Sequence, residues 1–357
     1  MSVDTATRSP AATSAPRAGT LQLTLRRLVR ANEFYVFLVI VALALIIQAR
    51  SGQFFTATNL VGLANAMVVP GLFAVGVYMV LVSGGIDVSF PALASLAVYA
   101  VTRVLVDNSF QGSFLVPLVM VIALGAVLGA FNGLFTSRLT VPTLIITLGT
   151  ANVFSGVMQG ALSSVQINQL PPSMSDFGRS ALLRVTSAQS GLTAVLPVSF
   201  LFLVAVVAVV FFIMRFTMFG RGVYAIGGDE AAAVRAGFKV RRTKFWLYVG
   251  VGVIAAIAGL IRTSMMGQMH PTNLLGMEMM VIAAVVLGGT AITGGTGSLT
   301  GVMLGTFLIV TVQNSMILVG VPTYWQRFAL GMLIIIGTGI SAVQLTRRRR
   351  RQRLVAE

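Results

Sequence analysis

The stretch GRGVYAIGGDEAAAVRAGFKVRRTK, residues 220–244, separates two apolar runs that are each long enough to cross a membrane. LPVSFLFLVAVVAVVFFIM precedes it at 196–214, and FWLYVGVGVIAAIAGLI follows it at 245–261. About 20 consecutive apolar residues span the hydrocarbon core of a bilayer. A compact, basic and helix-prone segment between two such runs is therefore expected to lie in water at one face of a membrane.

The composition of the whole chain points the same way. Of its 357 residues, 56% are hydrophobic and only 10% are charged, whereas soluble globular proteins carry about 25% charged residues. A net charge of +16 would suggest a nucleic-acid partner in a soluble protein, but basic residues also collect in the cytoplasmic loops of membrane proteins. The sequence therefore predicts an all-α polytopic membrane protein with no nucleic-acid partner.

Ten membrane segments are expected. They lie near 34–49, 59–83, 91–106, 114–136, 143–160, 195–214, 245–265, 274–289, 298–319 and 325–345. An even number places both termini on one side, and most of the 25 Lys and Arg residues fall on that side, which the positive-inside rule makes cytoplasmic.

Three regions follow from this division of the chain. They are a disordered, cytoplasmic N-terminal tail (1–33), a transmembrane permease domain (34–345) and a basic, cytoplasmic C-terminal tail (346–357). Within the membrane domain, the longest soluble parts are an outer loop at 161–194 and an inner segment at 215–244.

The sequence offers no catalytic, metal or nucleotide site. The chain has no cysteine and a single histidine, His270, which excludes disulfides, thiolate metal sites and multi-histidine clusters. It also has no phosphate-binding loop of the form GxxxxGK[ST]. We expect the chain to be no enzyme and to bind no cofactor, so that any ATP and Mg²⁺ are bound by another subunit.

Two acidic residues come close to the membrane interior, where such residues usually mark ion coupling. Asp87 ends SGGID just before VSFP, a position that fits either a turn and helix start or a gate in a transport path. Glu278 is expected near the outer boundary, within reach of water. Neither is expected to lie deep enough for a proton relay, which argues against an ion-coupled carrier.

Neutral polar residues are a second set of candidates within the membrane segments. Amide and hydroxyl groups can bond sugar hydroxyls without the desolvation cost of an ion, although they equally hold helices together. The gate or pathway candidates are Gly84, Gly85, Asp87, Asn65, Asn132, Asn152 and Asn314.

Glycines recur every four residues in two of the apolar segments. One row is Gly125, Gly129 and Gly133, and the other is Gly297, Gly301 and Gly305. On a helix this spacing leaves one face without side chains, so a neighbouring backbone can approach closely. We expect both rows to pack against other helices.

The inner segment contains a short helix of its own, expected at 229–236. Acidic residues occupy its first turn and Arg235 lies near its end, as the helix dipole favours. Gly237 follows, where a left-handed closing residue belongs. Such a helix suits docking against a separate moving protein, and the alternative is a solvated loop that only follows the positive-inside rule. The candidate coupling residues are Gly227, Gly228, Asp229, Glu230, Ala231, Ala232, Arg235 and Gly237.

Three separated motifs resemble one known family, the ribose-type permeases of ABC importers, which belong with the branched-chain amino-acid permeases. SGGIDVSFPAL at 83–93 is similar to that family's SGGIDLSVG segment. The stretch at 220–240 resembles its cytoplasmic segment G-x-x-x-Y-A-x-G-G-N-x-x-A-A-x-x-x-G-I. IAAVVLGGTAITGGTGSLTGVMLG at 282–305 resembles A-A-V-V-L-G-G-T-S-x-x-G-G-x-G. Asp229, in place of the usual Asn, and Phe238, in place of Ile, are departures.

The resemblance implies the permease fold of ABC importers and a set of partners. These are ATP-binding subunits, an extracytoplasmic sugar-binding protein and a second permease, identical or paralogous, in the lipid of the bacterial cytoplasmic (inner) membrane. By the same resemblance, 229–237 holds the coupling helix that enters a cleft of the ATPase. The alternatives are an ABC permease for branched-chain amino acids or nucleosides, and an ion-coupled secondary carrier.

Overall fold

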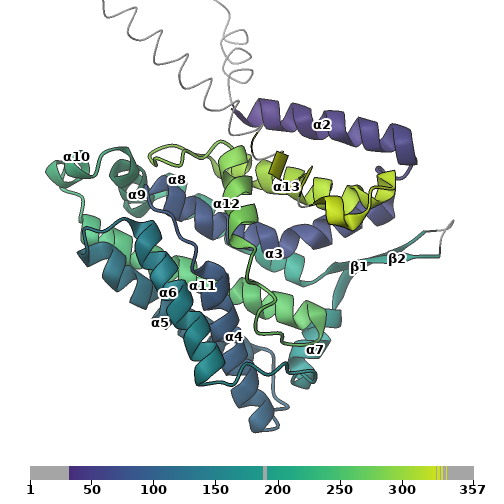
Figure 1. Cartoon of the computed structure of the whole chain (residues 1–357), viewed down its shortest axis with the longest axis horizontal. Helices are drawn as coiled ribbons and strands as arrows, with labels where there is room; N and C mark the ends of the chain where they lie inside the picture. The colour runs from purple at the N-terminus through teal and green to yellow at the C-terminus, as the bar shows by residue number, and fades with distance from the viewer. Residues whose placement is uncertain (1–31, 188–190, 327, 330, 333–334, 336–357) are drawn as a thin grey trace, which may run out of the picture.

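The computed structural model describes residues 32–187, 191–326, 328–329, 331–332 and 335 (Figure 1). The helices are α2 (Asn32–Ser51), α3 (Ala57–Val82), α4 (Phe90–Asp107), α5 (Leu115–Arg138), α6 (Thr143–Gly160), α7 (Pro172–Arg179), α8 (Ser199–Phe216), α9 (Met218–Gly228), α10 (Glu230–Arg235), α11 (Val240–Met266), α12 (Glu278–Leu287) and α13 (Leu299–Ser315). Two strands, β1 (Ala181–Thr186) and β2 (Thr193–Pro197), and two 3₁₀ turns, η1 (Ile317–Val319) and η2 (Thr323–Trp325), complete the described part.

Six of the described helices are long and apolar enough to cross a membrane, namely α2, α3, α4, α5, α8 and α11. The chain is therefore an integral, multi-pass membrane protein, as predicted. Helix α6 lies at the fifth predicted segment but is not among the six, and α12 and α13 are apolar but only 10 and 17 residues long. Ten crossings thus remain a prediction. Most of 325–345 and nearly all of both tails lie outside the described residues.

The outer loop corrects the all-α prediction. Residues 161–194 contain α7 and most of an antiparallel hairpin, in which Thr186 pairs with Thr193 and Ala181 with Pro197. The sequences ALLRVT and TAVLP contain β-branched residues, which favour strands. Both segments are too short to show the spacing of apolar residues that would favour a helix. The sixth membrane helix consequently begins at Ser199 instead of 195.

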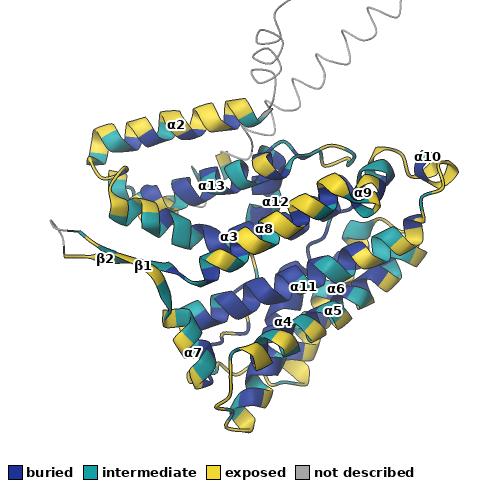
Figure 2. Ribbon diagram, turned by 180° about the vertical axis from the view of Figure 1, so that it is seen from behind, coloured by how far each residue is buried: buried dark blue, intermediate teal, exposed yellow. Residues whose placement is uncertain are grey.

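Helices α3, α4 and α11 form the core of the molecule. They are mostly buried, whereas α2 and much of α5 and α8 are exposed (Figure 2). Large apolar side chains such as Leu45 on α2, Val127 on α5 and Phe212 on α8 are more than half exposed. Because exposed apolar surface of this extent needs cover, these faces are expected to meet lipid or a partner.

The row on α5, and Gly301 and Gly305 of the second row, pack closely against other helices, as predicted. Gly297 lies in the loop before α13, where a Cβ would meet the Thr290 side chain at 2.9 Å. A Cβ on Gly125 would lie 2.7 Å from the Gly252 carbonyl oxygen, and one on Gly129 would lie 2.5 Å from that of Tyr248, so α5 presses backbone to backbone on α11. Cβ atoms on Gly301 and Gly305 would likewise overlap carbonyl oxygens of α12. Side chains at these positions would force the helices apart.

The soluble elements lie at opposite ends of the helical body. Helices α9 and α10 lie at one end, and α7 and the hairpin lie at the other (Figure 1). The start of α2 belongs to the α10 end, because Ser298, just before α13, donates to the Glu33 carboxylate. This arrangement places the inner segment and the first described residues on the same side.

Candidate functional site

Helix α10 is a short, self-contained unit of six residues. The Asp229 carboxylate caps it by accepting from the Ala232 amide at 2.9 Å, and Gly237 closes it with φ of +86°. Ala233 is buried against Ile226 and Val240, whereas Val234 is 58% exposed. The helix therefore rests on the body by one face and offers its opposite face to solvent.

An ion pair also ties α10 to the start of α11. The Lys244 ammonium lies 2.7 Å from the Glu230 carboxylate, and the lysine side chain is only 18% exposed. Glu230, Ala231 and Arg235 are exposed, whereas Ala232 is half-buried. A partner protein would thus contact a surface that carries both charges and the apolar Val234.

The glycines before α10 end a helix that the sequence analysis did not predict. Gly227 and Gly228 are the last residues of α9, which begins after Thr217 accepts from the Gly220 amide at 3.2 Å. Helix α9 was not predicted because it contains the glycines at 220 and 222, and glycine disfavours helix interiors. These glycines are used here for packing, since a Cβ on Gly220 would overlap the preceding helix α8.

Glycines of all three motifs meet at the α10 end of the helical body. We name the cluster of Gly84, Gly227, Gly294 and Gly295 the glycine junction. The Gly295 amide donates to the Val82 carbonyl at 2.9 Å. A Cβ on Gly227 would overlap that same carbonyl oxygen, and one on Gly294 would lie 2.6 Å from the Gly84 Cα. At this junction the end of α3, the end of α9 and the loop before α13 therefore touch through backbone atoms.

Two tyrosines fasten α9 beside the junction. The Tyr224 hydroxyl donates to the Gly297 carbonyl at 2.9 Å. Since its single proton is used there, the Tyr78 hydroxyl on α3 donates to it, at 2.6 Å. The two bonds link α3, α9 and the loop before α13 a second time.

Asp87 lies in the extended connection between α3 and α4, which leaves the junction at Gly84. It is 2% exposed, and its carboxylate accepts from the Ser89 amide and hydroxyl, both at 2.7 Å. The Ser89 hydroxyl accepts in turn from the Asn132 amide at 2.7 Å. Burial raises the pKa of the Asp87 carboxyl, and the bonds from Ser89 and the Phe90 amide oppose that rise. Asp87 thus organises the turn before α4, although Ser89 is the residue that immediately precedes the helix.

The same connection is bonded to the start of α6. The Ile86 amide donates to the Thr143 hydroxyl at 2.9 Å, and the Val88 amide donates to the Thr147 hydroxyl at 3.3 Å. The side-chain amide oxygen of Asn132 is buried nearby with no hydrogen-bond partner among the described residues. The α3–α4 connection is therefore held by α5 and α6, with a spare polar group beside it.

A cavity of about 780 Å³ opens at this end of the molecule. Its walls come from the α5–α6 connection, from α10 and the start of α11, and from Gly84 and Ile86. Arg138, Arg241 and the Lys244–Glu230 pair line its mouth. The cavity thus joins the helix α10 to the connection that carries Asp87.

Comparison with known proteins identifies the family of this chain. The family described as branched-chain amino acid transport system, permease component, matches residues 59–337. The chain belongs to this family. Within that range lie all three motifs that form the glycine junction and α10.

The relatives of this permease carry import functions in their names. It is 30% identical to the autoinducer 2 import system permease protein of Klebsiella pneumoniae, over 87% of this chain and 86% of the relative. It is 32% identical to the ribose import permease protein of Bacillus subtilis, over 84% and 89%. It is 28% identical to the xylose transport system permease protein of Escherichia coli, over 88% and 92%. No solved structure matches the chain.

The permease brings only some of its candidate pathway residues together. Gly84, Gly85, Asp87 and Asn132 share the α3–α4 connection and its contacts. The other three lie elsewhere: Asn65 is half-buried on α3, whereas Asn152 and Asn314 are exposed and donate to their own helices. A pathway role for these three has no support from neighbouring polar groups.

The sequence analysis missed the two tyrosines and the glycines at 294 and 295. The motif segment GRGVYAIGG contains Tyr224 and could have drawn attention to it. Its partner Tyr78 lies in an apolar run that carries no such signal. Gly294 and Gly295 belong to the third motif, and only folding brings them to α9. Their left-handed φ values of +86° and +76° show why glycine is needed there.

Removal of the Tyr224 hydroxyl is expected to loosen α9. Tyr224→Phe leaves both the Gly297 carbonyl and the Tyr78 hydroxyl without a partner, and should destabilise the permease by about 1 to 2 kcal/mol. Tyr78→Phe removes only a donor and should cost less. Thermal unfolding of the two variants and the double variant in detergent checks this. Equal losses of stability in the two single variants, and their full sum in the double variant, would contradict the hydrogen bond between the two tyrosine hydroxyls.

Proposed function

We propose that this chain is the transmembrane subunit of an ATP-binding-cassette importer, located in a bacterial cytoplasmic membrane with both termini inside the cell. In this proposal it binds no nucleotide. It works with ATP-binding subunits at its inner face, a second permease subunit beside it and an extracytoplasmic binding protein at its outer face. The hairpin and α7 would then face that binding protein.

The observation that carries the proposal is the position of α10. This helix is exposed on one face, has its own cap and closing glycine, and follows directly on the glycine junction. Movement of α10 would be transmitted to the α3–α4 connection through backbone contacts between glycines. Glycine has no side chain whose rearrangement could take up that movement. Such a rigid link suits the transfer of movement from a separate protein into the membrane helices.

The mechanism that fits this geometry is alternating access. ATP binding closes the ATP-binding subunits, which carry α10 with them, and the junction passes the motion to the α3–α4 connection and to α9. The two permease subunits then rock, so that the path opens outward to receive solute from the binding protein. Hydrolysis restores the inward-open state, and the cavity between α10 and Ile86 serves as the exit.

A sugar or sugar-like solute is the substrate that we propose. The relatives named above for ribose, xylose and autoinducer 2 support it, and so do the uncharged polar side chains of Asn132, Thr143 and Thr147 around the α3–α4 connection. Neutral amides and hydroxyls bind sugar hydroxyls without the desolvation cost of an ion. Uptake of labelled ribose, xylose and leucine by vesicles that contain the full complex and ATP distinguishes these solutes.

Val234→Asp tests the docking of α10. Val234 is 58% exposed, so the variant should fold normally, but a buried, unpaired carboxylate at the interface should cost several kcal/mol of binding. We expect ATP-driven uptake to fall at least tenfold. Val234→Ala, the matched control, should stay within about threefold of the wild type.

The chain has no cysteine, so a second measurement is available. A single cysteine at Ala231 should crosslink to the ATP-binding subunit, and one at Leu192 on the hairpin should not. Normal uptake by Val234→Asp, or an assembled and active complex without the Ala231 crosslink, would refute the docking of α10. Uptake by vesicles with an ion gradient and no nucleotide would instead favour a secondary carrier.

A further inference from the structure

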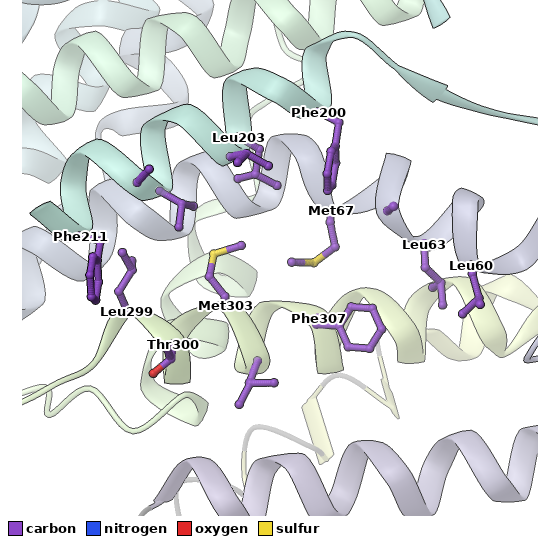
Figure 3. A pocket seen from close by; sticks show the side chains of 15 residues that line it. Leu60, Leu63, Met67, Phe200, Leu203, Phe211, Leu299, Thr300, Met303 and Phe307 are labelled. Carbon is purple, nitrogen blue, oxygen red and sulfur yellow. The ribbon is translucent and has the colours of Figure 1, made fainter. Parts of the chain in front are cut away.

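An apolar groove of about 810 Å³ runs between α3, α8 and α13 (Figure 3). Its floor includes Leu63 and Leu203, which are 1% and 2% exposed. Its rim includes Leu60, Val204 and Phe211, each more than 40% exposed. The groove is therefore open to whatever surrounds the helices, and in a membrane that surrounding is hydrocarbon or another protein.

The groove is long enough to hold an extended acyl chain. On α8 it extends from Phe200, beside Met67, to Phe211, beside Leu299 (Figure 3). Eleven helical steps correspond to about 16 Å along the axis. On α3 the groove continues from Met67 to Leu60, about 10 Å further (Figure 3). The part along α8 corresponds to roughly half of the hydrocarbon core, which is about 30 Å thick, and the groove as a whole is longer than one leaflet.

The surface of the groove suits a flexible chain better than a packed helix. Met67 and Met303 lie at its centre (Figure 3), and methionine adapts its shape to irregular occupants. None of the described residues that line it is a glycine. By contrast, α5 and α11 meet through Gly125, Gly129 and Gly252, as expected where membrane helices pack on each other.

A cation marks the end of the groove that lies toward α9. Arg215 follows Phe211 by one turn on the same face of α8, and its guanidinium lies 5.8 Å from the Phe211 ring centre. The side chain is exposed, and among the described residues no carboxylate lies within ion-pair distance of it. It stands where the headgroups of the inner leaflet begin if α9 and α10 face the cytoplasm.

We propose that this groove binds an acyl chain of an anionic phospholipid of the inner leaflet, whose phosphate is held by Arg215. The assignment to the inner leaflet rests on the proposed topology, whereas lipid binding itself does not depend on the ATP-binding subunits. Bound lipid would fill the space between α3 and α13, the two helices that lead to and from the glycine junction.

Native mass spectrometry of the full chain tests the proposal, with phosphatidylglycerol or phosphatidylcholine of identical acyl chains added in detergent. Wild-type protein should retain phosphatidylglycerol in preference. Arg215→Gln should weaken phosphatidylglycerol binding about fivefold and leave phosphatidylcholine unchanged, since one basic residue contributes about that much at an anionic surface. Arg138→Gln, at the end of α5, is the matched control and should behave as the wild type.

A second variant tests the groove itself. Ala208 lines it and is exposed, so Ala208→Phe should fill it without disturbing the fold and weaken binding of both lipids at least tenfold. Ala205→Phe, on an exposed part of α8 outside the groove, should have no effect. Unchanged lipid binding by Ala208→Phe, or equal losses from Arg215→Gln and Arg138→Gln, would overturn the proposal.

Disulfide trapping separates the other possible occupants. A single cysteine at Ala208 that yields disulfide-linked dimers in membranes would show that a second copy of the chain covers the groove. An internal disulfide between cysteines at Ala208 and Met332 would show that the C-terminal segment covers it. Either result would overturn lipid binding and would leave the docking of α10 untouched.

Discussion

Gly227→Ala is expected to abolish ATP-driven uptake. The added Cβ would overlap the carbonyl oxygen of Val82 and approach the Gly295 amide to 2.5 Å, and these two backbone groups are hydrogen-bonded to each other. No flexible side chain can yield, so either α9 moves away or the bond breaks. Overpacking of this kind typically costs about 1 to 3 kcal/mol, and a rigid backbone contact falls at the upper end. We therefore also expect a lower midpoint of thermal unfolding in detergent.

The neighbouring glycine provides a matched control. A Cβ on Gly228 would meet nothing within 4 Å, and its φ is not in the left-handed region. Gly228→Ala should therefore unfold at the wild-type temperature. If both variants unfold alike and both transport solute, the glycine junction does not link α9 to α3 as the structure indicates, and the proposed transfer of motion loses its route.

Asp87→Ala is expected to have the largest effect on folding. The change leaves the Ser89 amide and hydroxyl without their acceptor in a site that is 2% exposed. Each buried unsatisfied donor costs about 1 to 3 kcal/mol, so the loss for the two donors should be about 2 to 6 kcal/mol. We expect little folded protein in the membrane, measured as the monodisperse fraction after extraction in mild detergent.

Asp87→Asn separates the structural role from a gating role. Its amide oxygen can still accept from Ser89, so the variant should fold and retain uptake within about threefold of the wild type. A well-folded Asp87→Asn protein that fails to transport would show that the carboxylate itself is required, as a gate or pathway residue. That result would contradict the interpretation of Asp87 as the organiser of the turn before α4.

Local patterns were sufficient for much of the candidate site. The cap at Asp229, the short helix after it and the left-handed Gly237 all follow from residue types that act within one turn. The glycine row on α5, and Gly301 and Gly305 on α13, predicted close packing for the same reason, since four-residue spacing defines a helix face. Helix α9 was missed because its glycines serve contacts with α8 and α3, which propensity alone does not reveal.

The apolar runs, the sparse charge and the basic flanks of this sequence determine by themselves that the chain spans a membrane, because hydrocarbon accepts only long apolar segments with satisfied backbones. The order of its three motifs likewise identifies the family. Only the tertiary structure decided that the glycines of these motifs meet in one junction, that Tyr78 pairs with Tyr224, and that Asn152 faces away from the rest. Contacts between residues more than a hundred positions apart depend on how the helices pack, and no local pattern encodes them.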